Sequence, residues 1–192
     1  MSAIKIFQTT SRIVMGTGSL ANVRDEIERI GKSLVMIITD PGIVGAGILG
    51  QLEAILKEGG ISYSVFDNVE PDPQLKTAAK AREMIAETRA DIVIGIGGGS
   101  PIDIAKVAAV LATDEADIAE MIGIDMVKKP GLPTIIIPTT AGTGSEVTPI
   151  AILSDHEDKL KKGIVSPYLF PTVAVLDADL TVGLPPHVTA AT

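Results

Sequence analysis

Short runs of apolar, mostly β-branched residues alternate along this chain with segments of helical periodicity. No other feature restricts the fold as strongly. The apolar runs predict buried strands at 34–39, 62–66, 92–96, 134–137 and 173–176. Helical periodicity lies between them at 19–30, 48–58, 74–88 and 101–112. Strand–helix–strand units of this spacing form right-handed crossovers, so we expect an α/β fold with a Rossmann-like parallel sheet and helices on both faces.

Charge and cysteine content narrow the classes of function. The net charge is −8 and no basic cluster is visible, so we expect no nucleic-acid partner. The chain has 0 cysteines, which excludes disulfides, thiolate metal ligands and a cysteine nucleophile. No apolar run reaches the ~18–20 residues that span a membrane, and the first residues lack a signal-peptide pattern. We therefore expect a cytoplasmic protein with no membrane partner.

A run of glycines at 97–99 follows the buried strand 92–96 and leads directly into a helix. Ser100 is expected to cap this helix, with Pro101 at its first position and Asp103 as the acid of a capping box. Glycines let the backbone approach a ligand closely, and the N–H groups at a helix start attract an anion. The pattern therefore predicts a pyrophosphate site, and a tight turn without a ligand is the alternative.

A loop rich in hydroxyl groups follows the buried strand 134–137, with the sequence Pro-Thr-Thr-Ala-Gly-Thr-Gly-Ser-Glu at 138–146. Such a loop at the carboxyl edge of a parallel sheet offers hydrogen bonds to ribose and amide groups. An ordinary Ser/Thr-rich turn is the alternative. The segments 146–153 and 161–165 are expected to be extended around an exposed turn at 154–159, as a hairpin laid over the end of the sheet.

Two further features are less specific. Asp40 follows the first buried strand and precedes Pro-Gly. An acid there can accept hydrogen bonds from an adenosine ribose and repel a 2′-phosphate, although Asp-Pro-Gly is also an ordinary turn. Gly16-Thr-Gly18 opens the helix 19–30, but the third glycine of the dinucleotide fingerprint is missing, so this segment alone favours a turn.

The motifs Gly-Gly-Gly-Ser-Pro-x-Asp (97–103), Pro-Thr-Thr-Ala-Gly-Thr-Gly-Ser-Glu (138–146) and Pro-x-Val-Ala-Val-Leu-Asp-Ala-Asp-Leu (171–180) occur in this order. Together they resemble the iron-containing (group III) alcohol dehydrogenases, and the resemblance covers essentially the whole chain. That family joins an N-terminal α/β domain, which binds NAD(P), to an all-helical C-terminal domain that holds the catalytic metal. The resemblance implies a dinucleotide-binding domain at 1–184 and, at 185–192, the start of the first helix of a truncated C-terminal domain.

The resemblance also implies that the cofactor is NAD and which residues contact it. The residues expected at the pyrophosphate are Gly97, Gly98, Gly99 and Ser100. Those expected on the adenosine side are Asp40, Asp72, Thr139, Thr140, Gly142, Leu180 and Leu184. Those expected beside the nicotinamide half are Thr148, Leu153 and Lys161. Asp40 is expected to favour NAD over NADP.

The metal ligands of the family have no counterpart in this sequence. They are an Asp in a Gly-x-Asp-Ala-x-x-His segment and three later histidines, and neither His156 nor His187 matches one of them. We therefore expect no metal ligand and no catalytic residue in this chain, which alone should be inactive. The resemblance implies that the full-length protein binds iron or zinc and forms a homodimer or a larger assembly. Its expected reaction is hydride transfer between NAD and a small alcohol, diol or aldehyde substrate.

Other functions remain open at this point. Dehydroquinate-synthase-like enzymes and polyol or glycerol dehydrogenases share the fold, although the unbroken loop at 138–146 favours an alcohol dehydrogenase. A nucleotide-binding fragment without catalysis is a second alternative. A P-loop NTPase is disfavoured because no Gly-Lys-Ser/Thr follows the glycines.

Overall fold

The computed structural model describes residues 4–155 and 159–192, and within them the main sheet has six strands, all parallel. In spatial order the strands are β1 (Ile13–Met15), β9 (Val173–Leu176), β6 (Thr134–Pro138), β4 (Ile92–Gly97), β2 (Leu34–Ile38) and β3 (Ser62–Phe66). The sequence-predicted strands are all present. β1 was not predicted, because three residues at a sheet edge carry too little periodicity to stand out.

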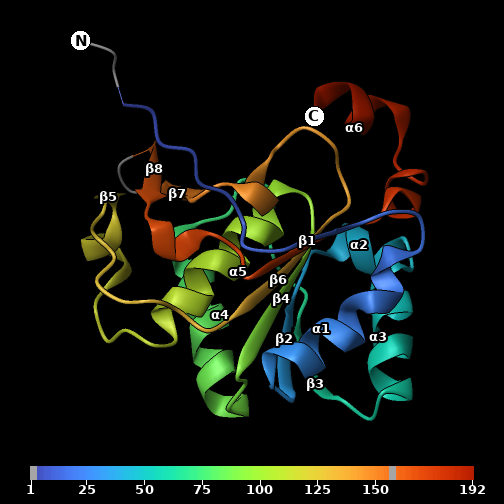
Figure 1. Ribbon diagram of the computed structural model, residues 1–192. Coiled ribbons are helices and arrows are strands. Elements are labelled where there is room, and N and C mark those ends of the chain that lie inside the picture. The colour runs from blue at the N-terminus through green and yellow to red at the C-terminus, as the bar shows by residue number, and fades with distance from the viewer. Residues whose placement is uncertain (1–3, 156–158) are drawn as a thin grey trace.

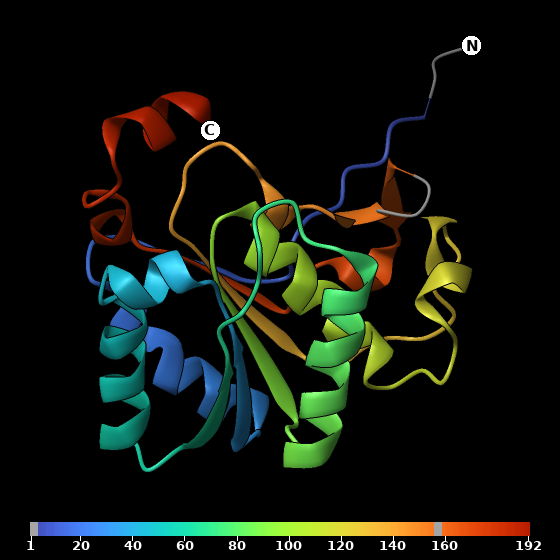
Figure 2. The ribbon, with the colours of Figure 1, turned by 180° about the vertical axis from the view of Figure 1, so that it is seen from behind.

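Helices cover both faces of this sheet, as expected (Figures 1 and 2). One face packs against α1 (Val23–Ile30) and α3 (Ile48–Glu58), the other against α4 (Leu75–Thr88) and α5 (Gly99–Leu111). The side chains of β2 alternate between the two apolar cores, because successive residues of a strand point to opposite faces. Among the described helices, none combines the length and the apolar character that a membrane crossing needs.

The strand order reverses at one place, between β2 and β4. From β2 the chain moves outward to β3, and it then returns across β2 to β4 and continues in the opposite direction to β6. Loops after the carboxyl ends of two such strands diverge, which opens a crevice where parallel α/β sheets bind their ligands. β2 is followed by Asp40 and α2 (Pro41–Gly45), and β4 ends in the glycine turn 97–99, which leads into α5.

A second, smaller sheet contains β5 (Gly123–Ile124), β8 (Leu160–Val165) and β7 (Ile150–Asp155). β7 and β8 form the expected antiparallel hairpin, and its inner face packs on α5 through Ala151 and Leu153. The expected strand from 146 was wrong at its start, because residues Ser145–Val147 form a 3-10 turn, η3. Residues 156–158 of the expected turn, with His156, lie outside the described residues.

Two predicted helix starts also differ. The helix predicted at 19–30 is divided into a 3-10 turn, η1 (Ser19–Asn22), and α1. The capping prediction for α5 was wrong: Gly98 is the N-cap and Ser100 is the second helical residue. The flexible backbone of Gly98 and Gly99 lets the helix begin before Ser100. The carboxylate of Asp103 does not cap the helix, because it accepts a hydrogen bond from the N–H of Ile152.

The remaining elements are short. They are the 3-10 turns η2 (Ile118–Met121), η4 (Pro167–Leu169) and η5 (Ala178–Thr181), and the helix α6 (Pro186–Ala191). α6 begins with a proline, whose fixed φ angle suits the first helical position. Figure 1 shows α6 beside the loop that follows β6, on the same side of the sheet as α2.

Candidate functional site

Gly97 and Asp40 meet at the reversal of the strand order. Gly97 has φ 144°, and a Cβ there would lie 2.5 Å from Cγ of Pro101 and 3.2 Å from Oδ2 of Asp40. The Oδ1 atom of Asp40 accepts hydrogen bonds from the N–H groups of Gly42 (2.8 Å) and Ile43 (3.1 Å), so this carboxylate caps α2. Asp40 therefore serves as a turn residue and also presents a carboxylate oxygen beside the glycine turn.

The N-terminus of α5 lies in the same turn. The first N–H groups of a helix have no partner within it, and no described side chain caps this end. A Cβ on Gly98 would lie 3.7 Å from Oγ1 of Thr140, and one on Gly99 would lie 3.2 Å from Cγ2 of Thr143. Backbone donors, a helix dipole and the small residues around them suit a phosphate group.

The loop 138–146, here called the hydroxyl loop, is joined to this turn by a backbone hydrogen bond. The N–H of Thr139 donates to the carbonyl of Gly97 at 2.9 Å. The Oγ1 atoms of Thr139 and Thr140 are buried, and neither has a hydrogen-bond partner among the described residues. Buried hydroxyls are normally hydrogen-bonded, so this pair points to a polar ligand beside the glycine turn. NAD fits that chemistry, because it carries a pyrophosphate and ribose hydroxyls.

The residues expected on the nicotinamide side lie on or near the hairpin. Nζ of Lys161 is 2.9 Å from Oδ1 of Asp72, and both side chains are more than half exposed. Asp72 has φ 57°, which suits an aspartate in a turn. Thr148 is half-buried just before β7, whereas Leu153 is fully buried in the core under the hairpin. The side chain of Leu153 thus packs inward.

The other residues expected on the adenosine side lie in two places, at η5 and in the loop 138–146. Leu180 is buried in the core beneath η5, and Leu184 is half-buried after it. Gly142 is exposed in the hydroxyl loop with φ 143°, and a Cβ there would overlap the backbone carbonyl of Thr192. The end of α6 therefore lies against this loop.

The Gly16-x-Gly18 segment has a different role from the glycine turn. Oδ1 of Asp177 accepts a hydrogen bond from the N–H of Gly18 at 3.0 Å, and Oδ2 accepts one from Leu20 at 2.9 Å. An internal carboxylate thus takes the donors that an anion could use at this turn. The preference of the sequence for a turn over a second phosphate site agrees with this geometry.

Lys106 was missed by the sequence analysis. Its side chain is 0% exposed, and Nζ donates to the backbone carbonyls of Ser145 (3.0 Å), Thr148 (3.0 Å) and Ile150 (2.6 Å). Burial lowers the pKa of this ammonium from 10.5 to about 8, although nearby carboxylates oppose the shift. A lysine in the otherwise apolar run 104–111 was the available signal, because a buried charge requires partners.

Asp103, one turn earlier on α5, holds the same segment. Its Oδ2 atom accepts a hydrogen bond from the N–H of Ile152 at 2.9 Å. Burial raises the pKa of the Asp103 carboxyl, while Lys106 and the Ile152 N–H oppose that shift. The spacing of Asp103 and Lys106 places both side chains on the face of α5 that carries the hairpin.

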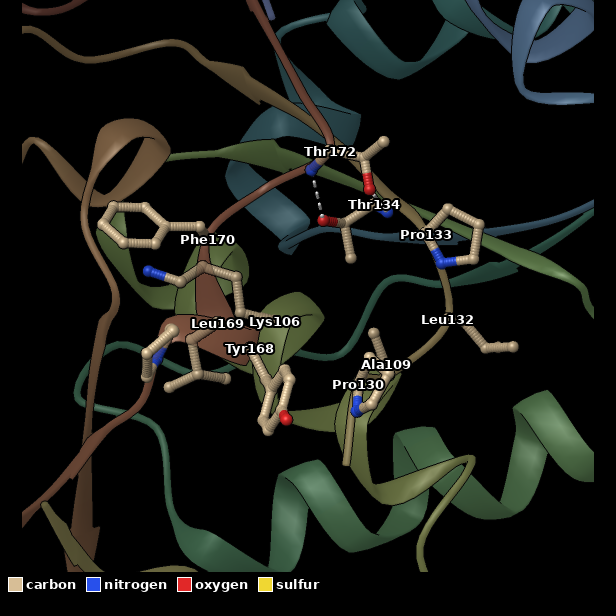
Figure 3. A pocket seen from close by; sticks show the side chains of 12 residues that line it. Lys106, Ala109, Pro130, Leu132, Pro133, Thr134, Tyr168, Leu169, Phe170 and Thr172 are labelled. Carbon is tan, nitrogen blue, oxygen red and sulfur yellow. Dashed lines mark hydrogen bonds between the residues drawn. The ribbon is translucent and has the colours of Figure 1, made fainter. Parts of the chain in front are cut away.

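A cavity of about 190 Å³ lies at the opposite, amino edge of β6. Figure 3 shows Lys106 in its wall with Leu169 and Phe170, and the reciprocal hydrogen bonds between Thr134 and Thr172. None of the sequence-predicted cofactor residues lines it. We therefore place the candidate site at the carboxyl edge of the sheet. Within residues 4–155 and 159–192, no group of three or more His, Cys, Asp or Glu could hold a metal ion.

Comparison with known proteins agrees with this fold. The sequence profile of the iron-containing alcohol dehydrogenases matches residues 10–178. A sulfoacetaldehyde reductase from Bilophila wadsworthia is 40% identical over 187 residues, which cover 97% of this chain and 48% of that protein. The chain thus spans about half the length of the curated relatives it matches.

Solved structures give the same relationship. A 1,3-propanediol oxidoreductase has a TM-score of 0.95 and 32% identity, over 99% of this chain and 50% of that one. A sulfoacetaldehyde reductase from Bifidobacterium kashiwanohense, determined in complex with NAD+, has a TM-score of 0.89 and 31% identity, over 99% of this chain and 50% of that one.

Proposed function

This chain belongs to the iron-containing alcohol dehydrogenase family, and on that premise we propose that it is the NAD(H)-binding half of an enzyme that transfers a hydride between NAD and a small alcohol or diol. One observation carries the assignment of the cofactor. The glycine turn, the Asp40 carboxylate and the unpartnered hydroxyls of Thr139 and Thr140 converge where the strand order reverses.

Each group has a proposed task in holding NAD. The backbone of Gly97, Gly98, Gly99 and Ser100 binds the pyrophosphate at the start of α5. On the adenosine side we place Asp40, Asp72, Thr139, Thr140, Gly142, Leu180 and Leu184. Beside the nicotinamide half we place Thr148, Lys161 and the backbone of Leu153. The complex of a relative with NAD+ supports this choice of cofactor.

The ion pair between Asp72 and Lys161 links a residue that we place on the adenosine side of the site to one that we place on the nicotinamide side. It joins the loop before α4 to the hairpin at a distance of 2.9 Å. We propose that Lys161 turns from this carboxylate to the ribose of the nicotinamide half when NAD binds. An exposed ion pair contributes only about 0–1 kcal/mol, so exchanging partners costs little.

The reaction itself is proposed from the relatives. Relatives of this chain include a long-chain-alcohol dehydrogenase, a lactaldehyde reductase and a 1,3-propanediol oxidoreductase. NAD supplies the nicotinamide ring that accepts or donates the hydride. The residues of this chain hold and orient that ring, and no group of three or more His, Cys, Asp or Glu among the described residues fits a metal ion.

Titration of the 192-residue chain with NADH, beside a Gly98→Val variant, tests this proposal. Gly98 has φ −78°, and its Cβ would make only ordinary contacts, so the variant should keep its fold. The valine side chain occupies the approach of the pyrophosphate and should weaken NADH binding at least about tenfold. Gly50→Val is the control, since Gly50 lies in α3 with no atom near its Cβ. Equal NADH affinity in both variants would contradict the proposed site.

A further inference from the structure

Helix α5 connects the two ends of the proposed cofactor site. It begins at Gly99 in the pyrophosphate turn, and Lys106 lies seven residues along it, which is about 10 Å along the helix axis. At that point its ammonium group meets the segment that leads from the hydroxyl loop into β7. The same helix therefore carries the phosphate donors at one end and the anchor of the hairpin further along.

The segment 145–152 depends on this anchor because it lies at the edge of the smaller sheet. It includes the 3-10 turn η3 and the start of β7, an edge strand that has a strand neighbour, β8, on one side. Lys106 supplies all three of its N–H donors to carbonyls of this segment, and Asp103 accepts the N–H of Ile152. Thr148, proposed beside the nicotinamide half, contributes one of those carbonyls.

Simple core packing does not account for a lysine at this position. Burying an ammonium group costs several kcal/mol, and a methionine would fill a similar volume without that cost. What the ammonium adds is three directional donors at one point, which fix a backbone that hydrophobic packing alone would leave free to shift. Figure 3 shows the Lys106 side chain beside the apolar side chains of Leu169 and Phe170.

We propose that Lys106 and Asp103 are positioning residues that set the place of the nicotinamide side of the site relative to the pyrophosphate turn. This inference rests on the proposed function. The adenosine side has its own attachment, because Thr139 is bonded directly to Gly97. Loss of the Lys106 anchor should therefore impair the nicotinamide half of the site and leave the adenosine and pyrophosphate half intact.

Binding of ADP and of NADH to the 192-residue chain separates these two halves. In Lys106→Met the dissociation constant of ADP should stay within about twofold of wild type, while that of NADH should rise about tenfold. Asp103→Ala removes one of the four hydrogen bonds that Lys106 and Asp103 make to this segment, and alanine is a good helix former. This variant should show the same selectivity with a smaller loss of NADH affinity. Lys80→Met, on the exposed face of α4, should change neither constant.

The result can contradict the inference in distinct ways. If both ligands weaken by the same factor, Lys106 supports the whole site; if neither weakens, it supports none of it. If Lys106→Met fails to fold by circular dichroism, the selectivity of Asp103→Ala decides. Wild-type chain that binds NADH no more tightly than ADP would overturn this inference alone. Wild-type chain that binds neither ligand would overturn the proposed function as well.

Discussion

The carboxylate of Asp177 accepts a hydrogen bond from the backbone N–H of Gly18 at 3.0 Å, although 159 positions separate the two residues. The same carboxylate also accepts the N–H groups of Leu20 and Asp179. Asp177 thus joins the turn before α1 to the turn after β9 and takes the place of an anion at a Gly-x-Gly helix start. The Leu-Asp-Ala-Asp-Leu motif has a structural purpose that its sequence alone does not reveal.

Asp177→Ala should lower stability by about 3 kcal/mol, because three buried or half-buried N–H groups lose their acceptor. Urea unfolding of the variant beside wild type measures this loss. Asp179→Ala is the matched control, since its side chain is exposed two positions away. A loss of stability no larger than that of the control would show that Asp177 does not link these two turns.

Asp40→Ser should change the preference between NADH and NADPH about tenfold toward NADPH, the ~1.4 kcal/mol that one charge-assisted contact supplies. Serine keeps a side-chain acceptor for the cap of α2, so the helix start is preserved while the negative charge is removed. Asp40→Gly removes charge and cap together and should shift the ratio in the same direction. Titrations with both cofactors measure the ratio; if it is unchanged in both variants, Asp40 is only a turn residue.

Glu26 should make the fold sensitive to acid. Burial alone would raise the pKa of its carboxyl, but hydrogen bonds from Arg29 (2.7 Å) and Arg12 (2.8 Å) outweigh burial and lower the pKa below 4.5. A group with a lowered folded pKa stabilises the fold above its unfolded value and loses that contribution as the pH falls.

Glu26→Gln tests this acid sensitivity, because the amide cannot ionise. The stability difference between wild type and Glu26→Gln should be on the order of 1 kcal/mol at pH 7 and should shrink below pH 4.5. Thermal unfolding across this range measures it. A difference that stays constant down to pH 3 would show that the carboxylate is not held by its arginines.

The fold and the position of the glycine turn between β4 and α5 could be predicted from sequence because each rests on local patterns. Asp40 follows one apolar run and Gly97 ends another, and the glycines at 97–99 indicate that the backbone there can approach another group closely. Lys106 and Asp177 could not be assigned in this way, because their partners are backbone atoms far along the chain. Backbone carbonyl and N–H groups are the same in every residue, so sequence does not identify which of them a side chain will meet.

Lys106 should also make stability rise with pH in an alkaline range. Burial lowers the pKa of its ammonium in the folded chain to about 8, against 10.5 for an ordinary lysine, although Asp103 and Glu146 oppose the shift. Between these values the folded chain has lost the proton that the unfolded chain still holds. Unfolding in that window takes up a proton, so raising the pH opposes unfolding.

Lys106→Met removes this contribution, and the stability advantage of wild type over the variant should therefore grow between pH 8 and 10.5. The growth should reach about 3 kcal/mol at most, from the difference between the two pKa values. Urea unfolding of both proteins at pH 7.5 and pH 10 measures it, and Lys80→Met controls for loss of an exposed lysine charge on α4. If the advantage stays constant or falls with pH, the Lys106 ammonium keeps its proton throughout. Its three carbonyl partners would then outweigh the cost of burial.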